Sequence, residues 1–390
     1  MTLNARPTAL TLARDADGGP TCDDSAVVGM ESAHEIVGRV QSKASAQMVP
    51  LNVSFELTLN CNIRCLHCYN LDRDEPRPAV ASASGCGAPK QELSLEERLA
   101  LLQNLRDAGT LFVGFTGGEV LTSPHLFPML DRARELNIAV QVLTNGTMLH
   151  PGMASRLAAY RNITGVSISI YGATPDVHDG ITQIPGSWRR TWDGARRMRR
   201  LGVAVRLKFI VMHQNAHETA AMRAAASAED FPYTVDVTIT PRHDGTRGSL
   251  VTRMDDGQLE ELYRGPLRDM VPAGKRQMTE ERFSCNCARG NCAISAYGDV
   301  YPCIAVPWAA GNVREQPFID IWRESPVFQR IRGLRIADYP ACAPCADKPY
   351  CSRNRGAAFN YSGDYTGVDP FVCKTAAITR AIATEPQPSD

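Results

Sequence analysis

The chain alternates between short apolar runs and longer stretches with helical periodicity. Residues 53–59 alternate apolar and polar side chains, as a strand with one buried face does. Further apolar runs predict strands at residues 110–116, 138–144, 166–170, 203–211 and 235–240. Amphipathic patterns between them predict helices at residues 94–108, 124–136, 148–160, 188–201 and 216–228. Six strands with intervening helices predict a parallel sheet, which binds its ligand at the carboxyl ends of its strands.

The pattern weakens on both sides of this α/β region. Residues 1–50 predict a weakly structured extension, with a short helix near residues 32–42. Residues 285–375 are rich in Gly and Pro and would need metal sites to hold a core. The expected domains are an extension, an α/β domain, a bridging region, a cysteine-rich domain and a tail, at residues 1–50, 51–245, 246–284, 285–375 and 376–390.

Composition narrows the function classes. The 390 residues include 42 basic and 42 acidic side chains, so the formal net charge is zero. The overall charge therefore gives no reason to expect binding to nucleic acid or to a membrane surface. No apolar run approaches the roughly 18 residues of a membrane span, and the N-terminus lacks a signal-peptide pattern. The chain is therefore expected to be cytoplasmic, where disulfides are rare. Its 13 cysteines, an odd number, then indicate metal binding.

The first cysteines form a C-x3-C-x2-C run, Cys61, Cys65 and Cys68, directly after the first predicted strand. Three thiolates on one loop can bind three irons of a 4Fe–4S cluster and leave the fourth iron open to another ligand. Zinc is the alternative reading, but structural zinc requires four ligands. His67 is adjacent to Cys68 and is poorly placed to share that metal.

This run resembles the signature of the radical SAM superfamily, and so do segments at the ends of the next three predicted strands. These segments are Thr116-Gly117-Gly118-Glu119, Leu143-Thr144-Asn145-Gly146 and Ser169-Ile170-Tyr171-Gly172. Taken singly, each segment also reads as an ordinary turn or strand end. The resemblance implies a partial (β/α)6 barrel in which the GGE segment contacts the amino group of S-adenosylmethionine (SAM). It also places Asn145 and Ser169 near SAM, and makes Arg189 or Arg190 the candidate for its carboxylate.

The chemistry implied by the resemblance is that of an oxidoreductase. A reduced cluster cleaves SAM to a 5′-deoxyadenosyl radical, which abstracts a hydrogen atom from the substrate. An electron donor such as flavodoxin or ferredoxin would be a partner.

The C-terminal cysteines resemble the SPASM extension of radical SAM enzymes, which carries two auxiliary 4Fe–4S clusters. Cys287, Gly298 and Cys303 match the first part of its pattern. The second part is matched by Cys342, Cys345, Cys351 and Cys373. With Cys285 and Cys292 included, eight thiols would hold the two clusters. A pair of zinc knuckles is the alternative, and Cys22 and Cys86 match nothing.

One position departs from the SPASM pattern. A cysteine is expected at position 355, where it would ligate the first auxiliary cluster, and the chain has Arg355 instead. Either Cys285 replaces the missing ligand, or the cluster has three cysteines and an open iron that could bind substrate directly.

The barrel region most resembles peptide maturases, so the expected function is radical modification of a ribosomally made peptide by crosslinking, epimerisation or oxidation. Many such enzymes carry an N-terminal leader-recognition domain of about 80 residues, whereas 50 residues precede the barrel here. Leader binding would then require a separate protein. The alternative is radical oxidation, epimerisation or decarboxylation of a sugar or nucleoside in natural-product biosynthesis. A non-catalytic electron carrier would leave the SAM motifs idle.

Overall fold

The computed structural model describes residues 33–70, 91–272 and 285–385, so Cys22 and Cys86 lie outside the described residues. The chain divides into two units, residues 1–40 and residues 41–390. Of the first unit, the structure describes the beginning of helix α1 (Ala33–Ala46), which matches the short helix expected near residues 32–42. All other elements belong to the second unit, to which the following description applies.

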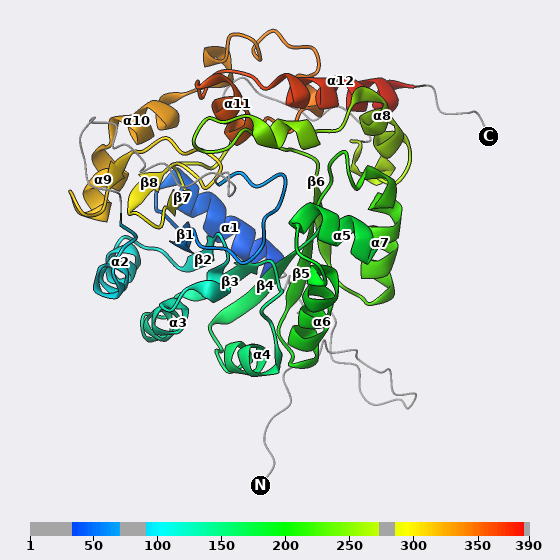
Figure 1. The fold of residues 1–390 in the computed structure, drawn as a ribbon. Coiled ribbons are helices and arrows are strands. Elements are labelled where there is room, and N and C mark those ends of the chain that lie inside the picture. The colour runs from blue at the N-terminus through cyan, green and yellow to red at the C-terminus, as the bar shows by residue number, and fades with distance from the viewer. Residues whose placement is uncertain (1–32, 71–90, 273–284, 386–390) are drawn as a thin grey trace, which may run out of the picture. The chain divides into compact units, whose positions relative to one another are not determined.

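A single sheet of nine strands forms the centre of the second unit, in the order β6-β5-β4-β3-β2-β1-β7-β8-β9 (Figure 1). Strands β1 to β6 each run parallel to their neighbours and confirm the predicted partial barrel. Their bounds are β1 (Asn52–Thr58), β2 (Phe112–Gly117), β3 (Ala139–Thr144), β4 (Ile163–Ile170), β5 (Val205–Ile210) and β6 (Tyr233–Asp236).

The sheet continues beyond β1 into the cysteine-rich region. Strand β7 (Asn291–Ile294) pairs in parallel with β1. Strands β8 (Asp299–Tyr301) and β9 (Gly311–Asn312) then follow in antiparallel pairings. One consequence is that the C-terminal cysteines are built onto the edge of the barrel sheet.

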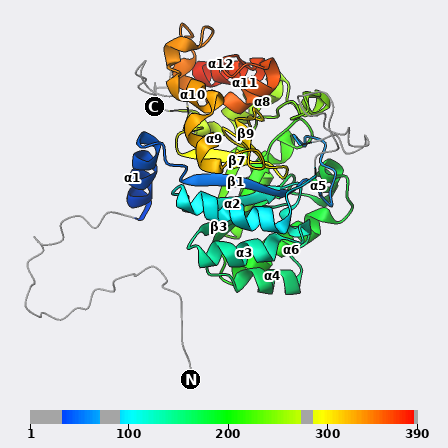
Figure 2. The same cartoon turned by 90° about the vertical axis from the view of Figure 1, so that its left-hand side faces the viewer.

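Helices connect the parallel strands and cover the outer face of the sheet, as α2, α3 and α4 do in Figure 2. The helices in the first half are α2 (Leu95–Asp107), α3 (Leu126–Glu135), α4 (Pro151–Ala158), α5 (Pro175–Thr182), α6 (Ser187–Arg200) and α7 (Thr219–Ala228). Those in the second half are α8 (Asp256–Arg264), α9 (Phe318–Glu324), α10 (Pro326–Gly333), α11 (Arg355–Ser362) and α12 (Pro370–Thr384).

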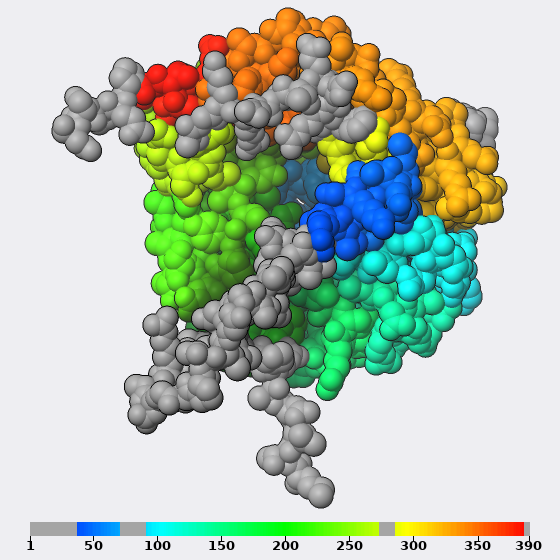
Figure 3. Space-filling view, turned by 180° about the vertical axis from the view of Figure 1, so that it is seen from behind, coloured from blue at the N-terminus to red at the C-terminus, as the bar shows by residue number. Residues whose placement is uncertain are grey.

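Short 3-10 helices complete the chain: η2 (Val120–Thr122), η3 (Ala216–Glu218), η4 (Gly248–Thr252), η5 (Arg268–Met270), η6 (Ile336–Asp338) and η7 (Lys348–Tyr350). In Figure 3 the red helix α12 lies against the yellow-green helix α8. No helix of the described residues is long and apolar enough to cross a membrane.

Local signals explain where the helices begin. The capping box at Ser94 is present, because the Ser94 hydroxyl accepts from Glu97 N at 3.2 Å and the Glu97 carboxylate accepts from Ser94 N at 2.6 Å. Glu97 also forms an ion pair with Arg314 at 2.6 Å, and the hydrogen bonds from Arg314 lower the pKa of Glu97 to about 2. Helix α5 was not predicted. It has eight residues and begins with Pro175 in its first turn, so its periodic pattern is short.

The core lies on both faces of the central strands, which explains why these strands read as short apolar runs. Phe55 of β1 and Phe115 of β2 are fully buried and meet edge to face with ring centroids 6.4 Å apart. The same core extends to Trp322 of α9, whose indole N–H donates to the Met48 carbonyl at 2.6 Å. The barrel and the cysteine-rich region therefore share one hydrophobic core.

Candidate functional site

The carboxyl ends of the parallel strands surround a cavity of about 240 Å³. Strands β1 to β5 or the loops that follow them all contribute side chains, as a parallel sheet predicts. The lining includes Cys61, Cys65, His67, Cys68, Tyr69, Thr116, Gly117, Gly118, Thr144, Asn145, Ser167, Ser169, Tyr171, Lys208 and Ile304. Three thiols and the ends of the predicted motifs thus meet in one place.

Backbone hydrogen bonds fix the cysteine loop on two sides. On one side, Gly118 N donates to Thr58 O and Glu119 N donates to Asn60 O, both at 2.7 Å. On the other side, Arg64 N donates to the last residue of α5, Thr182, at 2.9 Å. Because these bonds use the main chain, the three cysteine side chains are left to point into the cavity.

The two glycines of the GGE segment are required by this close approach. A Cβ atom on Gly117 would lie 2.1 Å from Thr58 O, and one on Gly118 would lie 2.4 Å from Asn60 O. Gly117 also has a φ of +138°, which favours glycine. Both glycines line the cavity, so they pack against the cysteine loop and present main chain to a ligand.

Glu119 does not line the cavity. Its carboxylate is 1% exposed and accepts from Thr144 Oγ1 at 2.6 Å, Leu121 N at 3.0 Å and Asn145 N at 2.7 Å. Burial raises the pKa of Glu119, and these hydrogen bonds lower it. The carboxylate therefore joins the end of β2 to the end of β3. The expected contact of the GGE segment with the SAM amino group stays a prediction.

Asn145 connects the end of β3 to the cysteine loop. Its side-chain N–H donates to Asn62 Oδ1 at 2.9 Å and lies 3.9 Å from Cys61 Sγ, while its Oδ1 accepts from Thr147. Ser169 also lines the cavity, in agreement with its expected place. Asn145 thus orients a candidate iron ligand as well as facing the cavity.

The basic residue of the cavity is different from the expected one. Arg189 and Arg190 are exposed on α6 and do not line the cavity. Lys208 of β5 does line it, directly opposite Ser169 in the β4–β5 register. Within the described part of the chain, no side chain forms a hydrogen bond or ion pair with Lys208. Sequence patterning missed Lys208 because a strand lysine usually faces solvent.

Two titratable groups lie in or beside the cysteine loop, the partly buried His67 and the buried Glu56. The His67 ring contacts Tyr171 with centroids 4.8 Å apart, and burial lowers the pKa of His67 to about 4. Glu56 of β1 is 3% exposed, and its Oε1 has no hydrogen-bond partner among the described residues. Burial, and then the nearby Glu92, raise the pKa of Glu56 to about 8. Both groups are therefore neutral at pH 7, which keeps charge away from this wall of the site.

The C-terminal cysteines form two sets. In thiol group A, Cys287 lies within hydrogen-bonding reach of Cys285 and Cys303, and these neighbours raise its pKa. In thiol group B, Cys342, Cys345 and Cys351 all act on the pKa of Cys373, which burial chiefly raises. Among the described residues, no three His, Cys, Asp or Glu side chains converge on a point that would hold a single metal ion. A four-iron cluster is a larger body than one ion and holds its thiolates around its outside.

Cys292 does not join thiol group A. It lies on β7 opposite Val53, is 2% exposed and packs in the hydrophobic core. Burial raises its pKa, and the charged group that opposes this effect is Arg332 rather than another thiol. Cys292 therefore packs in the core, apart from Cys285, Cys287 and Cys303, and its expected role as a cluster ligand stays a prediction. Thiol group A then consists of Cys285, Cys287 and Cys303.

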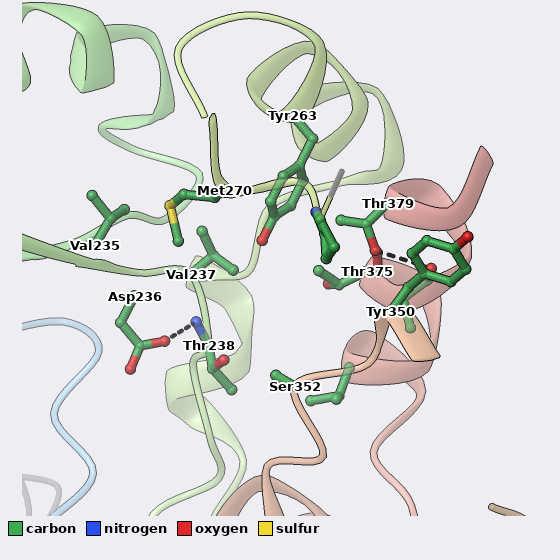
Figure 4. A pocket seen from close by; sticks show the side chains of 13 residues that line it. Val235, Asp236, Val237, Thr238, Tyr263, Met270, Tyr350, Ser352, Thr375 and Thr379 are labelled. Atoms are coloured by element: carbon green, nitrogen blue, oxygen red, sulfur yellow. Dashed lines mark hydrogen bonds between the residues drawn. The ribbon is translucent and has the colours of Figure 1, made fainter. Parts of the chain in front are cut away.

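A second cavity, of about 220 Å³, lies beside thiol group B. Figure 4 shows Tyr263 and Met270 on one side of it and Thr375 and Thr379 of α12 on another. Tyr350 and Ser352, which flank Cys351, also line it. Sequence analysis did not single out these residues.

Comparisons with known proteins agree with this geometry. Residues 55–224 match the radical SAM superfamily, and residues 285–346 match the SPASM iron–sulfur cluster-binding domain. The AdoMet-dependent heme synthase of Methanosarcina barkeri is 26% identical, over 83% of this chain and 96% of the relative. The mycofactocin maturase MftC of Mycobacterium ulcerans is 27% identical, over 82% of this chain and 87% of the relative. Streptococcus suis SuiB bound to its precursor peptide SuiA superposes with a TM-score of 0.60 at 16% identity, covering 90% and 84% of the two chains.

Replacement of Gly118 by Ala should disturb the cysteine loop, because the new Cβ would collide with Asn60 O. After anaerobic reconstitution, Gly118→Ala should hold about four fewer iron ions per chain than the wild type and should lose SAM binding in equilibrium dialysis. Gly180→Ala is the matched control, since no atom lies within 4 Å of its added Cβ. Full iron content and SAM binding in Gly118→Ala would contradict the assigned role of the glycine.

The raised pKa of Glu56 predicts a pH dependence of stability. The protonated form is favoured in the folded state, so its contribution is complete below pH 4.5 and is lost as the pH rises to about 8. Relative to Glu56→Gln, the wild type should lose roughly 1.4 kcal/mol of unfolding free energy per pH unit within that window. Anaerobic urea titrations from pH 6 to 9 measure this difference. Infrared spectra provide a direct check, because the wild type should show a protonated-carboxyl band that titrates near pH 8 and that the variant lacks. A difference between the two proteins that stays constant with pH would disprove the assignment.

Proposed function

This chain belongs to the radical SAM superfamily and carries a SPASM iron–sulfur domain, and on that basis we propose that it modifies a ribosomally made peptide by radical chemistry. The observation that carries the proposal is the meeting of Cys61, Cys65 and Cys68 with the GGE main chain in one cavity. The modification would be a crosslink, an epimerisation or an oxidation.

The residues of the cavity fit a 4Fe–4S cluster and SAM. Three thiols face the cavity, and Gly117 and Gly118 leave the space that a ligand requires. When bound and reduced, the cluster supplies the electron that cleaves SAM to a 5′-deoxyadenosyl radical. In this proposal the three cysteines hold the cluster, and Asn145 keeps the Cys61 thiol in place.

SAM is oriented by the remaining lining residues. The main-chain carbonyls of the GGE segment would accept from its amino group, and Ser169 would lie near its ribose or carboxylate. Lys208 replaces Arg190 as the candidate for the SAM carboxylate, because Lys208 lines the cavity and Arg190 is exposed. Burial favours the neutral forms of His67 and Glu56, so neither would compete with the SAM carboxylate for Lys208.

The two C-terminal thiol groups are the proposed ligands of two auxiliary clusters. Thiol group A supplies three thiolates, Cys285, Cys287 and Cys303, and thiol group B supplies four, Cys342, Cys345, Cys351 and Cys373. Ile304, which follows Cys303, lines the main cavity. A substrate in that cavity would therefore lie beside thiol group A. A flavodoxin or ferredoxin is the proposed electron donor, and a separate protein the proposed leader-binding partner.

A peptide substrate is supported by the similarity to a mycofactocin maturase and to SuiB in complex with its precursor peptide. A small-molecule substrate is the second candidate, and the similarity to an AdoMet-dependent heme synthase favours it. Incubation with any small precursor peptide that is found encoded beside this gene separates the two. A change in the mass of the peptide that requires SAM supports the first candidate, and no change with turnover of a small molecule supports the second.

The Cys61, Cys65 and Cys68 thiols should be indispensable for SAM cleavage. The reconstituted wild type should bind about 12 iron ions per chain and form 5′-deoxyadenosine with SAM and a reductant. The triple variant with Ala at these three positions should retain about 8 iron ions and form none. Cys292→Ala is the matched control, because that thiol lies in the core, and it should keep both iron and cleavage. Cleavage by the triple variant would refute the proposal.

Replacement of Lys208 by Met should weaken SAM binding, because Met keeps the length of the side chain and loses the charge. Loss of one charge-assisted contact of about 2 kcal/mol corresponds to roughly a 30-fold rise in the dissociation constant. Equilibrium dialysis of the reconstituted enzyme measures it, and Arg190→Met should bind SAM as the wild type does. Weaker SAM binding by Arg190→Met than by Lys208→Met would show that Arg190, and not Lys208, binds the SAM carboxylate.

A further inference from the structure

Arg355 is a buried cation for which the described residues provide no carboxylate. It begins helix α11 and is 7% exposed. Its guanidinium donates to Gly367 O at 3.2 Å and to Arg353 O at 3.4 Å, and it lies 4.9 Å from the centre of the Tyr339 ring. These are neutral partners. A buried charge is costly unless an opposite charge compensates it, so a source of negative charge is expected nearby.

The nearby groups are the thiols of both auxiliary sites. Arg355 Nη2 lies 3.9 Å from Cys342 Sγ in thiol group B. The same guanidinium acts electrostatically on Cys285 in thiol group A and on Cys351 in thiol group B. Arg355 thus contacts thiol group B directly, from the position at which the SPASM pattern has a cysteine. The next residue, Gly356, packs against Ala305, two residues after Cys303 of thiol group A, where an added Cβ would lie 2.5 Å from the Ala305 side chain.

We propose that Arg355 is an electrostatic link between the two auxiliary clusters, whose binding by these thiols is part of the proposed function. A cluster held by thiolates is negatively charged and becomes more so on reduction. A buried cation stabilises the reduced form more than the oxidised form, and the low dielectric of the surroundings enlarges that difference. Arg355 thus makes both clusters easier to reduce, in place of donating a ligand to one of them.

A purely structural role predicts different behaviour. If Arg355 only tied α11 to Gly367 and Arg353, its loss would change stability and would leave the reduction potentials unchanged. Net charge near a cluster, by contrast, is among the factors that set its potential. Reduction potentials therefore separate the two roles.

The test uses the reconstituted full chain as wild type, Arg355→Gln and Arg355→Lys, with redox titrations followed by electron paramagnetic resonance. Gln removes the charge and Lys keeps it. The midpoint potentials of both auxiliary clusters should shift to more negative values in Arg355→Gln and stay near the wild-type values in Arg355→Lys. The midpoint of the cluster bound by Cys61, Cys65 and Cys68 should not move and serves as the internal reference. Wild-type potentials for both auxiliary clusters in Arg355→Gln would overturn the proposal.

A third variant keeps the proposal testable if Arg355→Gln loses its clusters. Arg355→Cys restores the thiol of the SPASM pattern and exchanges a positive charge for a negative one. Iron content should stay at about 12 per chain, and the cluster of thiol group A should become harder to reduce than in Arg355→Lys. Equal potentials in these two variants would refute the electrostatic link.

Iron content and SAM cleavage of the wild type distinguish failure of this proposal from failure of the proposed function. A wild-type chain that binds fewer than three clusters, or forms no 5′-deoxyadenosine, refutes the proposed function itself. Normal iron content and SAM cleavage together with unmoved potentials refute only the role of Arg355.

Discussion

The close approach of the β2 end to the cysteine loop is the constraint on which the site depends. Gly118 N and Glu119 N bond to Thr58 O and Asn60 O at 2.7 Å, a distance that no side chain at Gly117 or Gly118 would permit. The buried Glu119 carboxylate then joins this contact to Thr144 and Asn145 at the end of β3. The ends of three consecutive strands are thereby joined, and main-chain bonds position the loop that carries the three thiols.

Continuity of the sheet explains how the two cysteine regions are positioned. Strand β7 adds to the free edge of β1 in parallel register, and Asn52 N donates to Gly290 O at 3.0 Å. In thiol group A, Cys285 and Cys287 precede β7, and Cys303 follows β8. Because β7 pairs with β1, the strand that leads into the Cys61 loop, this pairing also positions thiol group A. An open sheet edge would otherwise expose unpaired main-chain groups. The same pairing therefore closes the edge and sets the placement of the auxiliary site.

Charge is distributed unequally between the two sites. Beside the cavity, burial favours the neutral forms of His67 and Glu56, and Lys208 is a basic residue that lines the space. Near the auxiliary thiols, in contrast, a buried guanidinium is kept without a carboxylate partner. The Arg355 guanidinium thus lies next to a thiol, whereas the buried Arg98 lies beside Glu92.

The sequence by itself determined the six parallel strands and the meeting of the three thiols with the segments that end the next three strands, because strand periodicity and the carboxyl-end rule are local or topological. Only the tertiary structure decided what each side chain does there. Glu119 turned inward, Arg190 turned to solvent, Lys208 entered the cavity and Cys292 entered the core. Spacing along the chain cannot decide these outcomes, since which face of a strand or helix is covered depends on packing partners distant in sequence. Arg355 is the sharpest case: its departure from the pattern was visible in the sequence, but its contact with thiol group B comes from the fold.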